Sequence, residues 1–482
     1  MAKASDGNGK ARAGEPSSEL SSKVFSELSS QLASQPPSAG RPRLVDLLRR
    51  LDSIRALGVD LGLQRVRTAL DRLGNPERAA PAVHIAGTNG KGSTAAMTEA
   101  ILRAAGLRTG LFTSPHLVRF TERIRIDGSE AEGDHLAELD ARIVATGVPL
   151  TYFEVCTALA FLAFAEAGVD VMVLETGLGG RLDATTACWP VATAITSIGH
   201  DHLELLGPTL LDVAREKAGI AKPGVPLWLG PLAPEIDAVI AEVAAGVGAP
   251  VRRAGRDYPP APIAPSLGGA HQAANAALAV ALARAAVPAI ARSRAATAGG
   301  LGAREADARL AVAIRAGLTS VTWPGRLEWL GPDLLLDCAH NTEGAEALAA
   351  ALDALPHDRR RALVLSIVDG KPAAPMLALL VPRFDVVVAT RSPSPRAVSP
   401  PVLAALARAA VAPGRPPDAV EVAEADDPAA AVQEARRRAG TGGLVVVAGS
   451  MFLVGAVRAA LLGEPGDPVP TSDPLGRAGS QR

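Results

Sequence analysis

The sequence predicts an α/β protein with parallel sheets, and two observations support this. From residue 42 onward, short apolar segments rich in β-branched residues alternate with longer helix-like segments. This order is typical of parallel sheets that carry helices on both faces. The chain also has 482 residues, which is too long for one typical hydrophobic core, so we expect two domains.

The first alternating set covers the N-terminal half of the chain. Its predicted strands are residues 82–86, 108–113, 170–175, 192–197 and 226–229. Its predicted helices are residues 43–55, 62–72, 92–105, 155–167, 209–221, 234–246 and 271–286.

The second set follows a segment that ends at Trp323-Pro324-Gly325. Its predicted strands lie near residues 327–337, 362–366, 385–389 and 444–448. Its predicted helices lie near residues 343–354, 373–380, 401–409, 428–437 and 451–462. The domain boundary is therefore placed after residue 320, with domains at 41–320 and 321–464.

The two ends of the chain differ in composition from the rest. Residues 1–40 and 465–482 are rich in Ser, Gly, Pro and Ala. Segments of this composition bury too little apolar surface to fold, so we predict two disordered tails.

The composition argues against several classes of protein. Lys and Arg number 49 against 50 Asp and Glu, which leaves no basic footprint for nucleic acid. No uninterrupted apolar run reaches the ~18 residues of a membrane helix, and no secretory signal is recognisable. The three cysteines form no C-x-x-C pair, as expected for reduced thiols. We expect a cytoplasmic protein that binds neither nucleic acid nor membranes.

A glycine-rich turn between the predicted strand 82–86 and an Ala-rich helix is the most informative stretch. Glycines let backbone N–H groups approach a polyphosphate, a lysine can reach its β- and γ-phosphates, and hydroxyls can touch Mg²⁺. The residues concerned are Gly87, Gly90, Gly92, Lys91, Ser93 and Thr94. The strict phosphate-loop pattern is not met, because position 85 is isoleucine and a glycine follows the lysine. The alternative is an ordinary glycine turn with a solvated lysine.

Polar residues also follow the other predicted strands of this set. Ligands of open α/β sheets bind at the carboxyl ends of the strands, where Ser114, Glu175 and His202 lie. Mg²⁺ prefers oxygen ligands, so Ser114 and Glu175 suit it better than His202 does. A zinc site at His200 and His202 is the alternative, although no cysteine lies nearby in the sequence.

Two further groups of residues have an ordinary structural interpretation. Lys217 lies on the charged face of the predicted helix 209–221, and its pattern alone does not distinguish it from a solvated lysine. Asp337 and His340 follow an apolar strand of the second set, where they can form a helix N-cap turn. Arg326 follows the linker and can reach a phosphate across a cleft between the domains.

Taken together, these stretches closely resemble the folylpolyglutamate synthase/dihydrofolate synthase family of the Mur-ligase superfamily, over residues 42–462. The resemblance is carried by HIAGTNGKGST (84–94), LFTSPHLVRFTERIRIDG (111–128), TYFEV (151–155), VLETGLGGRLDATT (173–186), TSIGHDHLELLGPTL (196–210), AREKAGIAKPGVP (214–226), HQAANA (271–276), WPGRLE (323–328), LDCAHN (336–341) and GSMFLVGAVR (449–458).

The resemblance implies an N-terminal P-loop Mur-ligase-type domain that binds ATP and folate, and a smaller Rossmann-like C-terminal domain. It also implies an ATP-dependent amide ligase that works through an acyl phosphate. The expected cofactors are ATP and Mg²⁺, with two ions. The expected substrates are a folate or dihydropteroate together with L-glutamate, and a monomer is expected.

The resemblance further implies roles for individual residues. Nucleotide binding falls to Gly87, Thr88, Asn89, Gly90, Lys91, Gly92, Ser93, Asn275, Arg326 and Asp337. Metal binding falls to Ser93, Ser114, Glu175, His202 and a carbamylated Lys217. Substrate binding falls to Phe153, Asp183 and Ser450, and catalysis to Lys91, Lys217 and His340.

The chain departs from the family pattern in two places, both in the second set. Residues 337–342 read Asp-Cys-Ala-His-Asn-Thr, where the family usually has Asp-Gly-Ala-His-Asn-Pro. Residues 366–371 match the family only loosely. Two alternative functions also stay open, namely another Mur-type amino-acid ligase and a P-loop ATPase that performs no ligation.

Overall fold

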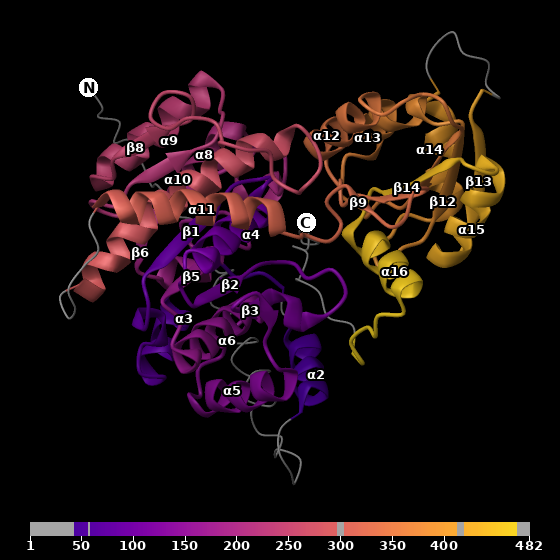
Figure 1. Cartoon of the computed structure of the whole chain (residues 1–482). Helices are drawn as coiled ribbons and strands as arrows, with labels where there is room; N and C mark the ends of the chain where they lie inside the picture. Colours follow the sequence, from indigo (N-terminus) through magenta and orange to yellow (C-terminus); the bar gives the residue numbers. More distant parts are fainter. Residues whose placement is uncertain (1–42, 56–57, 296–302, 412–418, 470–482) are drawn as a thin grey trace, which may run out of the picture.

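The computed structural model describes residues 43–55, 58–295, 303–411 and 419–469. It has two α/β units, drawn in indigo to salmon and in orange to yellow in Figure 1. The expected tail at residues 1–40 lies outside the described residues.

The N-terminal domain is built on an eight-stranded sheet with the order β4-β3-β2-β5-β1-β6-β7-β8. The strands β2, β5, β1, β6, β7 and β8 run parallel, and β3 and β4 are antiparallel additions at one edge. The bounds are β1 Ala82–Ala86, β2 Thr109–Phe112, β3 Ile124–Ile126, β4 Ser129–Glu130, β5 Val171–Glu175, β6 Pro190–Ile195, β7 Leu227–Leu229 and β8 Val251–Arg253.

Helices cover both faces of this sheet. Their bounds are α2 Leu44–Arg55, α3 Gln64–Arg72, α4 Lys91–Ala104, α5 Gly133–Ala145, α6 Tyr152–Ala167, α7 Leu203–Leu206, α8 Leu210–Ala218, α9 Pro234–Val247, α10 His271–Ala295 and α11 Ala303–Ser320. One core packs α4, α10 and α11 against β1 and β5, and the other packs α2, α5 and α6 against the opposite face. Within α10, residues 271–291 are long and apolar enough to cross a membrane, but half of that stretch is buried inside the fold.

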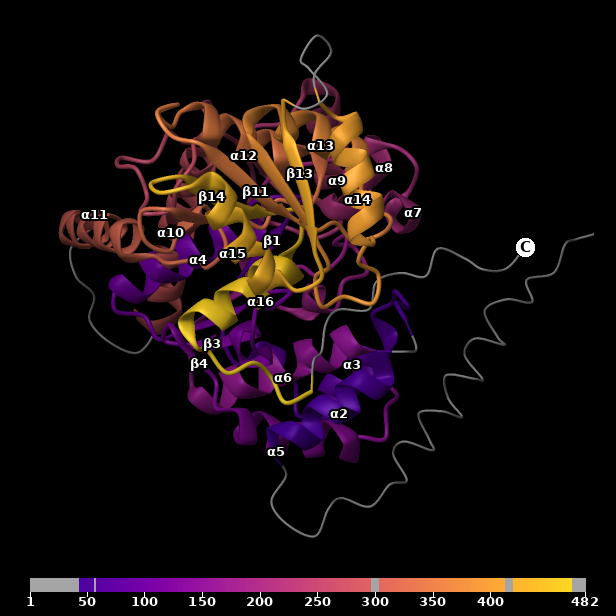
Figure 2. The same cartoon turned by 90° about the vertical axis from the view of Figure 1, so that its right-hand side faces the viewer.

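The C-terminal domain has a six-stranded sheet with the order β13-β12-β11-β14-β10-β9. Its strands are β9 Glu328–Trp329, β10 Leu334–Leu336, β11 Arg361–Leu365, β12 Val386–Thr390, β13 Glu421–Ala425 and β14 Leu444–Ala448. Its helices are α12 Thr342–Asp353, α13 Ala373–Leu380, α14 Pro400–Ala409, α15 Pro428–Ala439 and α16 Met451–Leu462. In Figure 2 this domain lies toward the viewer, in front of the upper part of the N-terminal domain.

The structure corrects several predicted elements. The single strand expected at 327–337 is an antiparallel pair, β9 and β10, which turns at Gly331 with φ 81°. Helix α11 was missed because its apolar residues are mostly alanines, yet Gly317 lets it lie against α4. A Cβ at Gly317 would come within 2.6 Å of the backbone of Ile101. The strands β3, β4, β8 and β13, the 13-residue helix α5 and the short helix α7 were also missed.

The disordered tail predicted at 465–482 is wrong for its first five residues. After α16, the chain returns to the N-terminal domain, where Asp467 accepts a hydrogen bond from the backbone N–H of Phe120 and Val469 packs on the hydrophobic core. One apolar residue and one well-placed carboxylate suffice to dock a segment that composition alone marks as disordered. Residues 470–482 lie outside the described part of the chain.

Candidate functional site

The glycine-rich loop lies at the carboxyl end of β1, in the middle of the first sheet. Strand β1 is flanked by β5 and β6, so the residues that end those strands lie on either side of the loop. The loop is tied to the end of β6, because Thr196 donates to the carbonyl of Asn89 at 2.6 Å and Asn89 N–H donates to Ser197 Oγ at 3.0 Å. Helix α4 then begins at Lys91, which directs its N-terminal N–H groups toward the loop.

Two of the loop glycines are required by geometry. Gly87 and Gly90 have φ values of 148° and 87°, a region that favours glycine. A Cβ at Gly90 would lie 2.5 Å from Oδ1 of Asn275. The side chain of Asn275 donates to Gln272, which in turn donates to Ser93 Oγ at 3.3 Å. Helix α10 thus brings the predicted nucleotide residue Asn275 against the loop.

Lys91, Glu175 and Ser114 come together beside this loop. Lys91 Nζ donates to the carbonyl of Thr88 at 3.1 Å and lies 4.0 Å from Glu175 Oε1. The other carboxylate oxygen of Glu175 accepts the backbone N–H of Ser114 at 3.2 Å. Glu175 is only 5% exposed. A buried carboxylate next to the loop lysine is an arrangement that suits a phosphate-bound divalent cation.

Lys217 points into the same region from α8. Its Nζ donates to the carbonyl of Gly87 at 2.7 Å, and the residue is buried. Burial, helped by the charge of Lys91, lowers the pKa of Lys217 to about 7. The interpretation as a solvated charged face is therefore wrong, because the side chain is buried, and burial favours the neutral amine.

His202 lies on the other side of the loop, in a left-handed conformation with φ 56°. Its Nε2 is 3.8 Å from Oδ1 of Asp201. Partial burial of the ring lowers the pKa of His202 to about 4, so the imidazole is neutral and has a lone pair for a metal. No group of three or more His, Cys, Asp or Glu side chains that could hold a metal occurs in the described residues. The predicted Mg²⁺ set extends beyond these four residue types, because it also uses serine, lysine and phosphate oxygens.

Asp201 links the two domains at this point. It pairs with Lys371 Nζ at 2.6 Å and lies 3.7 Å from His340 Nε2. Burial alone would raise the pKa of Asp201, but the nearby His340 ring and the positive charge of Lys371 hold it well below its usual range. The predicted catalytic residue His340 thus faces the loop side across the domain interface.

Two further contacts cross the interface near the loop. Asn89 and Asn341 exchange side-chain hydrogen bonds at 3.3 and 3.2 Å. His200 donates its backbone N–H to Glu343 Oε1 at 2.9 Å. The N-terminus of α12 therefore sits directly opposite the glycine loop.

Arg326, Asp337 and Ser450 lie on the C-terminal side of the interface. Asp337 accepts the backbone N–H groups of Leu327 and Ala339, both at 2.9 Å, and burial raises the pKa of Asp337. Arg326 lines a small cavity of about 40 Å³, which Ser114 lines from the other domain. Ser450 is 1% exposed, and its hydroxyl has no hydrogen-bond partner among the described residues.

Phe153 and Asp183 both contact the turn that follows β5. Asp183 accepts the backbone N–H groups of Gly177 and Leu178, both at 2.9 Å, and the hydroxyl of Thr185. A Cβ at Gly177 would lie 2.5 Å from the ring of Phe153. Asp183 thus shapes the turn after β5 that packs against this ring.

His84 of β1 supports the same turn from beneath. Since the Thr185 hydroxyl donates to Asp183, it accepts from His84 Nε2, which lies 2.8 Å away. Burial and the charge of Lys222 lower the pKa of His84 to about 3. The ring is therefore neutral. It donates a hydrogen bond to Thr185, which in turn donates one to Asp183.

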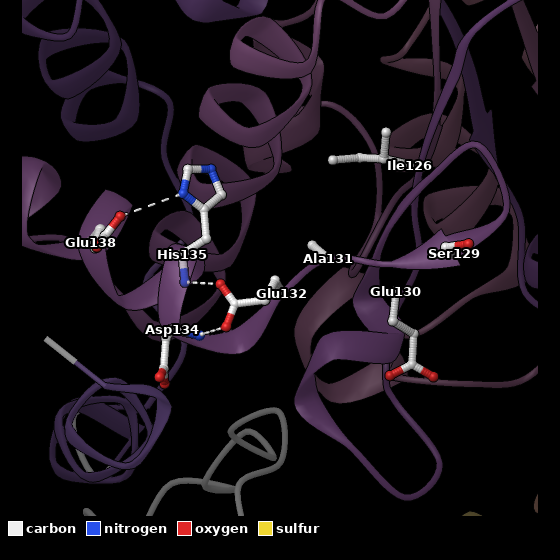
Figure 3. Close-up of a pocket in the computed structure, with 8 residues that line it drawn as sticks. All are labelled: Ile126, Ser129, Glu130, Ala131, Glu132, Asp134, His135 and Glu138. Atoms are coloured by element: carbon white, nitrogen blue, oxygen red, sulfur yellow. Dashed lines mark hydrogen bonds and ion pairs between the residues drawn. The ribbon is translucent and has the colours of Figure 1, made fainter.

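A second cavity, of about 610 Å³, lies away from the glycine loop (Figure 3). Four carboxylates line it, those of Glu130, Glu132, Asp134 and Glu138. Glu132 caps the N-terminus of α5 through the N–H groups of Asp134 and His135. This acidic lining repels phosphates, so the cavity is not the nucleotide site.

Sequence reasoning missed several residues of the interface. Asp201 stood between two histidines that drew attention as zinc ligands, and Lys371 stood in the segment that matched the family loosely. Gln272, which connects Asn275 to Ser93, stood at the start of a predicted helix and was assigned no role. A signal for Asp201 was its position directly before a predicted metal ligand.

Comparison with known proteins places this geometry in context. The model of the Mur ligase middle domain matches residues 85–225, and the model of the Mur ligase glutamate ligase domain matches residues 325–451. The chain is 34% identical over 440 residues to the dihydrofolate synthase/folylpolyglutamate synthase of Bacillus subtilis, covering 83% of this chain and 95% of that protein. It is 35% identical to a probable bifunctional folylpolyglutamate synthase/dihydropteroate synthase of Haloferax volcanii, of which it spans 49%.

A solved structure matches over almost the whole fold. It is the bifunctional folylpolyglutamate synthase/dihydrofolate synthase with Mn, AMPPNP and L-glutamate bound, at 33% identity and a TM-score of 0.74. The match covers 89% of this chain and 100% of that one.

Proposed function

Since the chain belongs to the folylpolyglutamate synthase/dihydrofolate synthase family of Mur ligases, we propose that it joins L-glutamate to a folate at the expense of ATP. The observation that carries this proposal is the position of the glycine loop. Its residue Asn89 contacts Asn341 of the second domain. Asp201, which precedes the predicted metal ligand His202, contacts His340 and Lys371 of the same domain. A nucleotide bound there lies between two domains that together exclude water.

Exclusion of water matters because of the expected chemistry. A carboxylate oxygen of the folate attacks the γ-phosphorus of ATP, and the bond to ADP breaks. The amine of glutamate then attacks the acyl carbon, the C–O bond to phosphate breaks, and the amine gives up a proton. An acyl phosphate hydrolyses in water, so a site closed between domains favours amide formation.

The residues of the loop fit the phosphates of ATP. Lys91 Nζ now rests on the carbonyl of Thr88, from where it can turn to the β- and γ-phosphates. The N–H groups of residues 87–93 and the N-terminus of α4 stabilise their negative charge. Asn275 is assigned to the nucleotide from α10, and Arg326 and Asp337 from the opposite wall.

The donor set also fits Mg²⁺. Glu175, Ser114 and Ser93 offer oxygen ligands beside the loop, and neutral His202 offers a nitrogen. Mg²⁺, when bound, would stabilise the negative charge of the phosphoryl group during its transfer. Mn in a related structure that also holds AMPPNP supports a divalent ion at the nucleotide.

Lys217 is assigned to a second ion, as its carbamate. A protonated lysine at this place would put a cation beside the metal site, whereas a carbamate supplies an anionic oxygen, the type of ligand Mg²⁺ prefers. Carbamylation needs a neutral amine and CO₂. The burial of Lys217 and its position 2.7 Å from the carbonyl of Gly87 support this assignment.

The substrates are assigned to two further regions. The folate lies near Phe153 and the turn held by Asp183. Glutamate lies on the C-terminal side, where Ser450 has a buried hydroxyl without a partner among the described residues. We expect a monomer in the cytoplasm, where the three buried cysteine thiols stay reduced.

One assay separates this function from its alternatives. Purified protein, ATP, Mg²⁺ and labelled glutamate are incubated in separate reactions with dihydropteroate, with tetrahydrofolate or with a nucleotide-sugar peptide. Label in either folate product supports the proposal and tells which acceptor is used. Label only in a nucleotide-sugar peptide identifies another Mur-type ligase. Phosphate release without any labelled product identifies an ATPase.

A further inference from the structure

The chain connects its two domains twice. The first connection is the linker between α11 and β9, and the second is the segment Gly463–Val469, which leaves α16 and returns to the N-terminal domain. In Figure 2 this yellow segment runs from α16 across the lower part of the molecule near α6. Its residues beyond Gly463 make contacts of three different kinds.

The first contact is an ion-pair bridge centred on Glu464. One carboxylate oxygen lies 3.3 Å from Nη1 of Arg119 in the N-terminal domain, and the other pairs with Arg458 of α16. Arg119 also pairs with Glu130 at 2.8 Å, and Arg458 with Glu328 at 3.0 Å. Glu464 therefore joins two arginines that are each anchored in a different domain.

The second and third contacts lie farther along the segment. Asp467 Oδ2 accepts the backbone N–H of Phe120 at 2.7 Å, at the start of a short 3-10 helix, Phe120–Arg123. Val469 packs on the core that contains α2, α5 and α6. A polar anchor and an apolar anchor thus fix the segment to the N-terminal domain.

The part of the N-terminal domain that is held here leads directly to the site. It follows Ser114, and Leu117 touches both the linker and α16. A Cβ at Gly455 of α16 would lie 2.1 Å from the carbonyl oxygen of Leu117, and one at Gly325 would lie 3.5 Å from its side chain. These contacts join the C-terminal domain to the residues next to Ser114.

We propose that Gly463–Val469 is an interdomain strap, which together with the linker restricts rotation of the C-terminal domain and keeps the loop 114–123 seated at the interface. Two separate connections between the same domains allow fewer relative rotations than a single linker does. The expected effect of the strap on the KM for glutamate rests on the proposed function. Its expected effect on domain motion does not depend on that function.

Two shortened chains test the strap. One ends at Gly463 and lacks it, and the other ends at Val469 and is the matched control. Labels on Ala245→Cys of α9 and Ala405→Cys of α14, both exposed, report the interdomain distance by electron–electron resonance. The native cysteines are buried and react slowly.

The strap predicts a broader and longer distance distribution for the chain that ends at Gly463, and an unchanged distribution for the chain that ends at Val469. It also predicts a roughly fivefold higher KM for glutamate in the shorter chain, because fewer molecules occupy the closed state that binds substrate. Identical distributions for both shortened chains would overturn the proposal.

A point variant covers the case in which the shorter chain does not fold. The double substitution Glu464→Gln with Asp467→Asn removes both charged contacts and keeps side-chain size, and Glu346→Gln on the exposed face of α12 is its control. The double variant should broaden the interdomain distance distribution. A distribution equal to that of the Glu346→Gln control contradicts the strap. The two proposals can fail separately. If the full chain performs no ligation but the altered chains still show the broader distance distribution, the proposed function is wrong and the strap is supported.

Discussion

Lys217 Nζ lies 2.7 Å from the carbonyl oxygen of Gly87, so a buried amine from α8 contacts the first residue of the glycine loop. This relationship predicts that Lys217→Ala lowers kcat by roughly 10²-fold or more, because an oxygen ligand of a metal is lost. Short carboxylic acids should restore part of the activity by filling the gap. Steady-state kinetics with and without added acetate measure both effects.

A control and a spectroscopic test accompany that variant. Arg215→Ala alters an exposed residue of the same helix and should leave kcat unchanged. ¹³C-bicarbonate NMR should detect a carbamate on the unaltered protein that is missing in Lys217→Ala. An active Lys217→Ala enzyme, or an unmodified amine in the Mg²⁺–ATP complex, would return Lys217 to a purely structural role.

Lys91→Ala tests the phosphate loop. The lysine makes one hydrogen bond to the backbone of Thr88 and a pairing of 4.0 Å with Glu175, so its loss should change the melting temperature little. It should reduce kcat/KM by roughly 10²-fold or more, because the Lys91 ammonium group no longer stabilises the negative charge of the phosphoryl group that is transferred. Near-normal turnover with an unchanged melting curve would remove Lys91 from the site.

Glu175→Gln tests the metal assignment. The amide keeps the size of the carboxylate and its hydrogen bond from Ser114 but removes the charge. We expect the Mg²⁺ concentration for half-maximal activity to rise roughly tenfold, with a lower kcat. Glu166→Gln, which alters an exposed surface pair, is the control. If the Mg²⁺ titration of Glu175→Gln overlays that of the unaltered enzyme, Glu175 does not bind the metal.

His84 gives a prediction for the dependence of stability on pH. Its folded-state pKa of about 3 lies below the 6.5 of an unfolded chain, so between these values only the unfolded state takes up the proton. The free energy of unfolding contributed by His84 should therefore fall as the pH drops below 6.5, by about 1.4 kcal/mol per pH unit.

Urea unfolding at pH 7 and pH 5 measures this effect. His84→Gln keeps a side-chain donor for Thr185 but does not titrate, so its stability should fall by about 2 kcal/mol less between these two pH values. His357→Gln, at an exposed histidine, should behave like the unaltered chain. Equal pH dependence in His84→Gln and the unaltered chain would rule out a buried neutral His84.

Much of the architecture follows from the sequence because the central strands are short, apolar and buried on both faces. Strand β1 has the predicted bounds 82–86, and α13 has the predicted bounds 373–380. The edge strands β3, β4 and β9 carry too few residues for a periodic pattern to emerge. Their antiparallel pairing depends on tight turns, such as those at Gly128 and Gly331, which both have positive φ.

The site could be predicted only in part. The loop residues, Glu175 and Ser114 follow from residue type and from their place at strand ends. The burial of Lys217 could not be predicted, since it depends on how α8 packs under Gly87. Asp201 and Lys371 lie 170 residues apart, and their pairing depends on the placement of two domains, which no local pattern encodes. The docking of Asp467 and Val469 was missed for the same reason.

The most direct test of the ligase mechanism follows the carboxylate oxygen of the folate. The acceptor is labelled with ¹⁸O in the carboxylate that reacts, and the phosphate released in the presence of glutamate is analysed by mass spectrometry. Formation of an acyl phosphate and its displacement by the amine predict one ¹⁸O in each phosphate, with one glutamate incorporated per ADP formed. Unlabelled phosphate, released at the same rate with and without glutamate, would contradict the proposed function.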